Sequence, residues 1–261
     1  MQNNIFQSIA NHRSIRKYKS TEVSDEIIQQ IAETAMNASS SGNMQCYSII
    51  VTKDQKIREE LYPLHFNQSM VMDAPVLVTF CADFNRMRKW VEKNQAPLNF
   101  DNFMSFMIAS IDATLIAQNF ALLAESLGLG ICFMGTTLAN AHEIGRVLNC
   151  PDNVVPVVGF SLGYPDESPE IRKRLPVSGV IHKEKYQDYN SEQIEDIYLE
   201  RETLGMKRYS EVPELKKMMI ENNVKTLAEV YTKLKYTRES HVTYSQNVLS
   251  YLENQNFMNN Q

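Results

Sequence analysis

Apolar residues along the first 165 positions follow two different spacings. Ile28, Ile31 and Ala35 recur at helical spacing behind Ser24, a favoured N-cap residue that is followed directly by acidic side chains, and they predict an early helix. Compact runs rich in β-branched residues predict strands at 46–52, 74–81, within 127–135 and at 154–162. Further helices are predicted at 55–61, 103–127 and 139–148. This order predicts an α+β fold, a mixed α/β sandwich with one central sheet flanked by helices.

The apolar stretch at 103–127 is long enough to cross a bilayer, but polar side chains interrupt it. Asp112, Gln118, Asn119 and Glu125 all lie within it. A carboxylate in hydrocarbon costs several kcal/mol, so the stretch is predicted to be a buried helix, and no membrane partner is expected. Its excess apolar face would be covered either inside one subunit or across two.

The chain becomes more polar and irregular after Gly163-Tyr164-Pro165. Prolines follow, and the last third is charged and mainly helical in pattern. We therefore expect a core formed by residues 1–182 and a C-terminal extension at 183–261, which wraps the core or a partner subunit.

Composition narrows the class of protein. The 261 residues carry a formal net charge of -5, which does not favour a nucleic-acid partner. The four cysteines are widely spaced and the five histidines lack metal-ligand spacing, so neither a disulfide scaffold nor a metal site is expected. The first ten residues lack a secretory pattern, and a cytoplasmic location is expected.

The candidate chemistry begins with a basic turn, which we define as residues 12–18. His12, Arg13, Ser14 and Arg16 lie within five positions of one another. Arginine offers paired planar donors, and serine and backbone N–H groups can fill the remaining oxygens of a phosphate monoester. A solvated basic helix end would explain the same residues, so both interpretations stay open on the spacing alone.

Two tracts of small residues have alternative explanations. The tract at 38–43 contains three consecutive serines and can form a loop that approaches a ligand, or a simple helix-terminating loop. Gly128 and Gly130 are expected to be a helix C-cap and a close-packing site. They are not a dinucleotide fingerprint, because there the helix precedes the strand.

Together these segments resemble the nitroreductase and flavin reductase family, and more narrowly its larger NADPH-preferring branch of oxygen-insensitive NADPH nitroreductases and NADPH-linked FMN reductases. The resemblance runs in order from about Asn4 to His182. It rests on His12-Arg13-Ser14-Ile15-Arg16, Ser39-Ser40-Ser41, Gln45, Phe80 to Arg86, Ala117-Gln118-Asn119, Ala124 to Gly130 and Arg174-Leu175-Pro176.

The resemblance implies a nitroreductase-like, mostly antiparallel fold that holds FMN at a homodimer interface. The implied contacts to the FMN phosphate and ribityl chain are His12, Arg13, Ser14 and Arg16, with added positive charge from Arg172 and Arg174. Ser40, Gln45 and Gln68 would reach the ribityl chain or the isoalloxazine edge, some of them from the second subunit. Backbone N–H groups of Phe133, Met134 and Gly135 would lie beside the flavin N5. Gln68 is also explained as an ordinary helix-start residue.

The implied reaction is a ping-pong transfer of hydride from NADPH or NADH to the flavin and then to a small nitroaromatic, quinone, azo or flavin acceptor. No side chain is assigned a catalytic role, because the flavin performs the redox step. Lys207 and Arg208 would pair with the 2′-phosphate of NADPH, although a solvated loop explains them equally, and Tyr209 stands where relatives carry Trp.

Two other functional classes remain compatible with the sequence. One is a non-catalytic flavin-binding or flavin-storage protein. The other is an enzyme or binding module in which the basic turn holds a different phosphorylated ligand.

Overall fold

The computed structural model describes residues 4–259 and divides the chain into two compact units. One unit contains the residues up to Ile171 together with those from Tyr244 onward, and the other contains Arg172–Thr243. The expected core at 1–182 and extension at 183–261 stay a prediction about domains.

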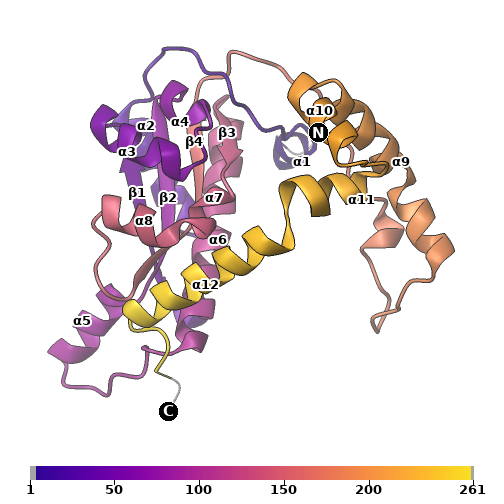
Figure 1. Ribbon diagram of the computed structural model, residues 1–261. Helices are drawn as coiled ribbons and strands as arrows, with labels where there is room; N and C mark the ends of the chain where they lie inside the picture. Colours follow the sequence, from indigo (N-terminus) through magenta and orange to yellow (C-terminus); the bar gives the residue numbers. More distant parts are fainter. Residues whose placement is uncertain (1–3, 260–261) are drawn as a thin grey trace. The chain divides into compact units, whose positions relative to one another are not determined.

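The first unit is built on a four-stranded antiparallel sheet with strand order β1-β2-β4-β3 (Figure 1). The strands are β1 (Tyr47–Thr52), β2 (Val76–Asp83), β3 (Gly130–Phe133) and β4 (Val154–Gly163). All four strands were predicted, and the expected α+β fold with one antiparallel sheet is confirmed.

Strand β2 lies inside the sheet, and all of its residues are buried. Val76, Val78 and Phe80 pack with α2 (Asp25–Ala35) and α6 (Phe103–Ser126). The alternate residue Leu77 packs in a second cluster with residues of α3 (Gln55–Leu64), α4 (Met70–Asp73) and α8 (Ala141–Val147). Because helices cover both faces of the sheet, the strand is apolar throughout instead of alternating.

Helix α6 is the central helix of this unit. Its N-cap Asn102 accepts a hydrogen bond from Ser105 N, and ten of its residues, Asp112 among them, are buried. Among residues 4–259 it is the one helix whose length and composition would suffice to cross a membrane, a property that core helices share. A row at helical spacing stays exposed, with side chains between 40% and 66% accessible: Phe103, Met104, Met107, Ile111 and Leu115.

The connection from α6 to β3 confirms the expected roles of its glycines. Gly128 has a φ of 80°, and Leu129 N donates to Ala124 O across it, as in a helix C-cap. A Cβ on Gly130 would lie 2.6 Å from the Ile15 side chain. This close approach lets Ile15 N donate to Ile131 O at 2.9 Å, which fixes the basic turn to the edge strand β3.

The remaining helices complete the two units. In the first unit they are α1 (Asn4–Ala10), η1 (Ser41–Asn43), α5 (Asn85–Lys93) and α7 (Thr136–Ala139). The second unit contains η2 (Val177–Gly179), α9 (Ser191–Ser210), α10 (Pro213–Glu221), α11 (Leu227–Glu229) and η3 (Val230–Lys235). Helix α12 (Arg238–Asn254) begins in the second unit and ends in the first, where Tyr251, Leu252 and Phe257 are buried.

Candidate cofactor site

The basic turn is fixed by two long-range contacts of its own side chains. His12 Nδ1 lies 2.7 Å from Glu125 Oε1, at the end of α6. The Arg13 guanidinium donates to Ser168 Oγ at 3.1 Å and to Pro169 O at 3.2 Å. Both contacts join the turn to segments more than a hundred residues away and hold it beside β3.

Ser14 and Arg16 are the least engaged members of the turn. The Arg16 guanidinium is exposed and makes one long bond, 3.5 Å, to Ser14 O. Neither Arg13 nor Arg16 forms an ion pair with a carboxylate within the part of the chain that the structure describes. The Arg16 guanidinium and the Ser14 hydroxyl form a donor set that fits a phosphate monoester, and the Arg13 guanidinium adds positive charge beside them.

The backbone of the turn differs from the expectation. Arg16 N and Lys17 N donate to Glu167 Oε1 at 2.5 and 3.1 Å, and Ile15 N is bonded to β3. The expectation that backbone N–H groups of the turn fill the phosphate oxygens is therefore wrong for these three residues. Side chains must supply the phosphate contacts there.

The segment after β3 partly fits the expected role. Phe133 ends β3, and Met134 N already donates to Gly159 O at 2.8 Å. The Gly135 amide has no acceptor among residues 4–259. Of the three predicted backbone donors, Met134 is thus already bonded inside the chain, whereas Gly135 can bond a cofactor atom.

Gln68 lies in a loop, residues 65–68, that is tied to this same segment. His65 Nδ1 lies 2.8 Å from Thr136 Oγ1, and Gln68 Nε2 donates to His65 O at 2.9 Å. Burial lowers the pKa of His65 to about 4, so the imidazole is neutral at pH 7. Phe66 and Asn67 have φ values of 57° and 53°, and the loop therefore stores backbone strain next to Gln68.

Ser40 and Gln45 lie in a second loop, between α2 and β1. The Ser40 hydroxyl donates to Asp112 Oδ2 at 2.8 Å and accepts from Gln45 N at 2.7 Å. Its hydrogen is therefore used inside the protein, and Ser40 can only accept from a bound molecule. The Gln45 side chain has only long contacts to Asn43 O and Oδ1, at 3.5 and 3.3 Å.

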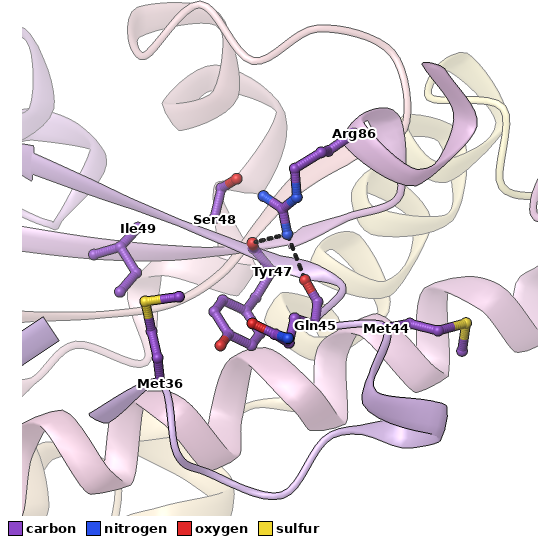
Figure 2. A pocket seen from close by; sticks show the side chains of 7 residues that line it. All are labelled: Met36, Met44, Gln45, Tyr47, Ser48, Ile49 and Arg86. Carbon is purple, nitrogen blue, oxygen red and sulfur yellow. Dashed lines mark hydrogen bonds between the residues drawn. The ribbon is translucent and has the colours of Figure 1, made fainter. Parts of the chain in front are cut away.

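A cavity of about 450 Å³ opens beside this second loop (Figure 2). Its lining residues are Met36, Met44, Gln45, Tyr47, Ser48, Ile49 and Arg86. Arg86 Nη2 donates to Gln45 O and Tyr47 O at 2.5 and 3.2 Å, as the dashed lines in Figure 2 show. The Tyr47 hydroxyl is buried and has no hydrogen-bond partner among residues 4–259.

The predicted contacts within the first unit form two separate groups. The basic turn, the 133–135 segment and Gln68 lie along the β3 edge, whereas Ser40 and Gln45 precede β1 at the opposite edge. Across the sheet, Ile131 of β3 lies level with Val76 at the start of β2, because both pair with Leu162 of β4. Tyr47 of β1 pairs instead with Ala82, near the end of β2. The basic turn is thus roughly 20 Å from the start of β1 along the strands and 14 Å across them, whereas the 133–135 segment is only about 10 Å from it along the strands.

The other predicted residues belong to the second unit. Arg172 and Arg174 are exposed in the coil before η2, and their expected meeting with the basic turn stays a prediction. Lys207 and Arg208 do not lie in a loop, because they form the last turn of α9. The Arg208 guanidinium carbon lies 5.1 Å from the centre of the Tyr209 ring, and Lys207 is exposed.

Sequence reasoning missed the residues that hold these candidates in place. They are Asp112, Glu125, Glu167, His65 and Arg86. The one available signal was a carboxylate inside the apolar 103–127 stretch, which must find donors when buried. Within residues 4–259 no cluster of side chains could hold a metal ion.

Comparison with known proteins shows the family of the chain. The family model described as "Nitroreductase family" matches residues 9–164. The NADPH-flavin oxidoreductase of Vibrio harveyi is 35% identical over 197 residues, which cover 74% of this chain and 79% of that protein. The FMN reductase (NADPH) of Bacillus subtilis is 36% identical over 186 residues, covering 70% and 75%.

A solved structure of the NADPH:FMN oxidoreductase from Vibrio harveyi, complexed with NAD+, has a TM-score of 0.77 to this chain. It is 30% identical and covers 98% of this chain and 100% of its own. The matches confirm the resemblance and the expectation that the chain is an enzyme. The chain belongs to the Nitroreductase family.

Proposed function

We propose that the protein is an FMN-dependent NAD(P)H oxidoreductase, a nitro and flavin reductase that passes electrons from NADPH to small oxidised acceptors. The observation that carries the proposal is the pair of uncompensated guanidiniums, Arg13 and Arg16, at the β3 edge of a nitroreductase-family chain. In a protein with a net charge of -5, such a local excess of positive charge favours a bound anion.

The residues along the β3 edge would bind the two ends of the cofactor with different groups. Ser14 and Arg16 would donate to the phosphate, and Arg13 and His12 would keep the turn in position. The free Gly135 amide and the Gln68 Oε1 would bond the isoalloxazine end. When bound, FMN supplies the two-electron exchange with the nicotinamide and the acceptor.

A homodimer is part of the proposal, because one chain does not bring both groups of contacts together. The sheet separates them, and helices cover both of its faces. A second copy could place its Ser40 and Gln45 against the first copy's basic turn. The exposed apolar row on α6 supports the same arrangement, since such a row is usually covered.

The remaining parts of the proposal concern partners and location. We expect ping-pong turnover, in which the nicotinamide and a nitroaromatic, quinone, azo or flavin acceptor use one open flavin face in turn. The relatives named for NADPH support that nucleotide over NADH. A cytoplasmic enzyme without membrane or nucleic-acid partners belongs to the same proposal.

The test is the absorption spectrum of the purified protein, followed by anaerobic addition of NADPH or NADH. Flavin bands that NADPH bleaches are expected. A yellow protein that neither nucleotide bleaches would be a flavin-storage protein, and a colourless protein that FMN cannot reconstitute would leave the phosphate site to another ligand.

Nucleotide choice has its own prediction. The double substitution Lys207→Ala/Arg208→Ala should raise KM for NADPH by about tenfold and leave KM for NADH unchanged, because a charge-assisted phosphate bond is lost. Steady-state kinetics with both nucleotides measure this, and Lys216→Ala on α10 is the matched control. An unchanged NADPH preference would exclude Lys207 and Arg208 from the 2′-phosphate site.

A further inference from the structure

We propose that Asp112 is a positioning residue for the flavin contacts of the loop between α2 and β1. It would act through a hydrogen-bonded clamp, which we define as Asp112, Ser40 and Arg86. This inference rests on the proposed function, and it adds Asp112 and Arg86, which touch no part of the cofactor themselves.

The first half of the clamp is the buried Asp112 carboxylate, which is 1% exposed. Its Oδ2 accepts from the Ser40 hydroxyl at 2.8 Å and from Cys46 N at 3.3 Å, and its Oδ1 accepts from Ser41 N at 3.0 Å. A carboxylate removed from water needs several donors, and here the loop supplies all three. Helix α6 thus fixes the loop in its middle, through Ser40 and Ser41, and at its end, through Cys46.

The second half of the clamp fixes Gln45 itself. Gln45 N donates to Ser40 Oγ at 2.7 Å, so the Ser40 hydroxyl links Asp112 to Gln45. Arg86 Nη2 donates to Gln45 O at 2.5 Å. Both backbone polar groups of Gln45 are therefore held, and its side-chain amide is left with only the long contacts to Asn43.

The backbone of the clamped loop has an unfavourable conformation at Gln45. Gly42 and Asn43, which tolerate positive φ, have values of 57° and 55°, whereas Gln45, with a φ of 53°, is in a region that such side chains rarely adopt. Such strain persists only where the surroundings determine it, and it clusters at ligand sites. Gln45 lines the 450 Å³ cavity, so the clamp fixes a residue that forms part of the cavity wall (Figure 2).

The experiment is a double-mutant cycle on FMN affinity with Asp112→Asn, Ser40→Ala and both together. Each single variant should weaken FMN binding about tenfold. The double variant should weaken it much less than the hundredfold expected for independent sites, because both substitutions disrupt the same hydrogen-bond network. FMN dissociation constants are measured by flavin fluorescence, well below the melting temperature of each variant. Ser41→Ala is the control, since only its backbone N–H bonds Asp112, and it should bind FMN within about twofold of the wild type.

The outcomes separate this inference from the proposed function. A wild-type protein that binds no FMN overturns the proposed function and the flavin role of the clamp together. If the wild type binds FMN and the Ser40→Ala and Asp112→Asn variants bind it equally tightly, the clamp serves only the fold, even if these variants melt at lower temperature. That result overturns the inference alone. A fully multiplicative double variant also overturns it. If Asp112→Asn does not fold, the cycle is run with Ser40→Ala and Arg86→Ala.

Discussion

Arg13 and Arg16 are three residues apart, yet their partners give them different roles. The Arg13 guanidinium is bonded to Ser168 and Pro169, whereas the Arg16 guanidinium has only a long contact inside the turn. We therefore expect Arg13 to support the shape of the turn and Arg16 to bind the phosphate directly.

The substitution Arg16→Ala tests this division. It should weaken FMN binding about 10- to 100-fold, the loss that follows from removing a charge-assisted hydrogen bond. The melting temperature of the cofactor-free protein should hardly change. Arg13→Ala, in contrast, should lower both the FMN affinity and this melting temperature. Titration with FMN and thermal unfolding measure them, and Lys19→Ala controls for loss of charge nearby. Equal melting losses in the two arginine variants would contradict the assignment.

His65 should make stability depend on pH. Burial depresses its folded pKa to about 4, below the unfolded value of about 6.5, so between these values only the unfolded chain binds the proton. Stability is then lost as the pH falls, by about 2 kcal/mol from this residue between pH 7 and pH 5. Urea unfolding at the two pH values should show a smaller loss in His65→Gln. An equal loss in both proteins would mean that His65 is not the titrating group.

At the scale of elements, local signals predicted the fold well where they were strong. Ser24 caps α2 as expected, and β2 is the buried strand that its unbroken apolar run predicted. Lys207 and Arg208, for which a loop was expected, lie in the last turn of α9 instead. The capping box formed by Asn190 and Gln193 is a local sequence signal for the start of α9.

The site was predictable in its residue types but not in its partners. His12 and Glu125 are 113 positions apart, and Ser40 and Asp112 are 72 apart. Hydrogen bonds over such separations depend on the tertiary fold, which spacing along the chain does not encode. The sequence could therefore indicate a phosphate ligand at 12–16, but not that Glu167 accepts hydrogen bonds from the amides of Arg16 and Lys17.

The exposed row on α6 carries a prediction for the dimer. Ile111→Glu/Leu115→Glu should convert a dimer into monomers and abolish FMN retention, because charges would replace apolar contacts. Sedimentation velocity and the flavin content of the purified protein measure this. Lys56→Glu, which changes the charge of an exposed residue on α3, is the control. A double variant that sediments like the wild type would place the interface elsewhere.

At the scale of the whole molecule, the separation of the two groups predicts how mixed dimers behave. Arg16→Ala damages the basic turn and Asp112→Asn damages the clamp. If each site takes its turn from one chain and its loop from the other, a mixed dimer has one site with both substitutions and one with neither.

Co-expression of the two variants under different affinity tags should therefore restore about half of the wild-type flavin content in the purified mixed dimer. This fraction follows from one intact site in two. Mixed dimers that retain no more flavin than the single variants would mean that each chain supplies its own turn and loop to one site.

The chain returns to its first unit after passing through the second. Residues from Tyr244 onward belong to that unit, where Asn153 Nδ2 donates to Gln255 O and Asn256 O and Phe257 is fully buried. The second unit is thus an insertion within a continuous core. A single protease cut between 172 and 243 should leave two fragments that stay associated without a covalent link, so the enzyme is a candidate for a split reporter that reassembles from separately expressed halves.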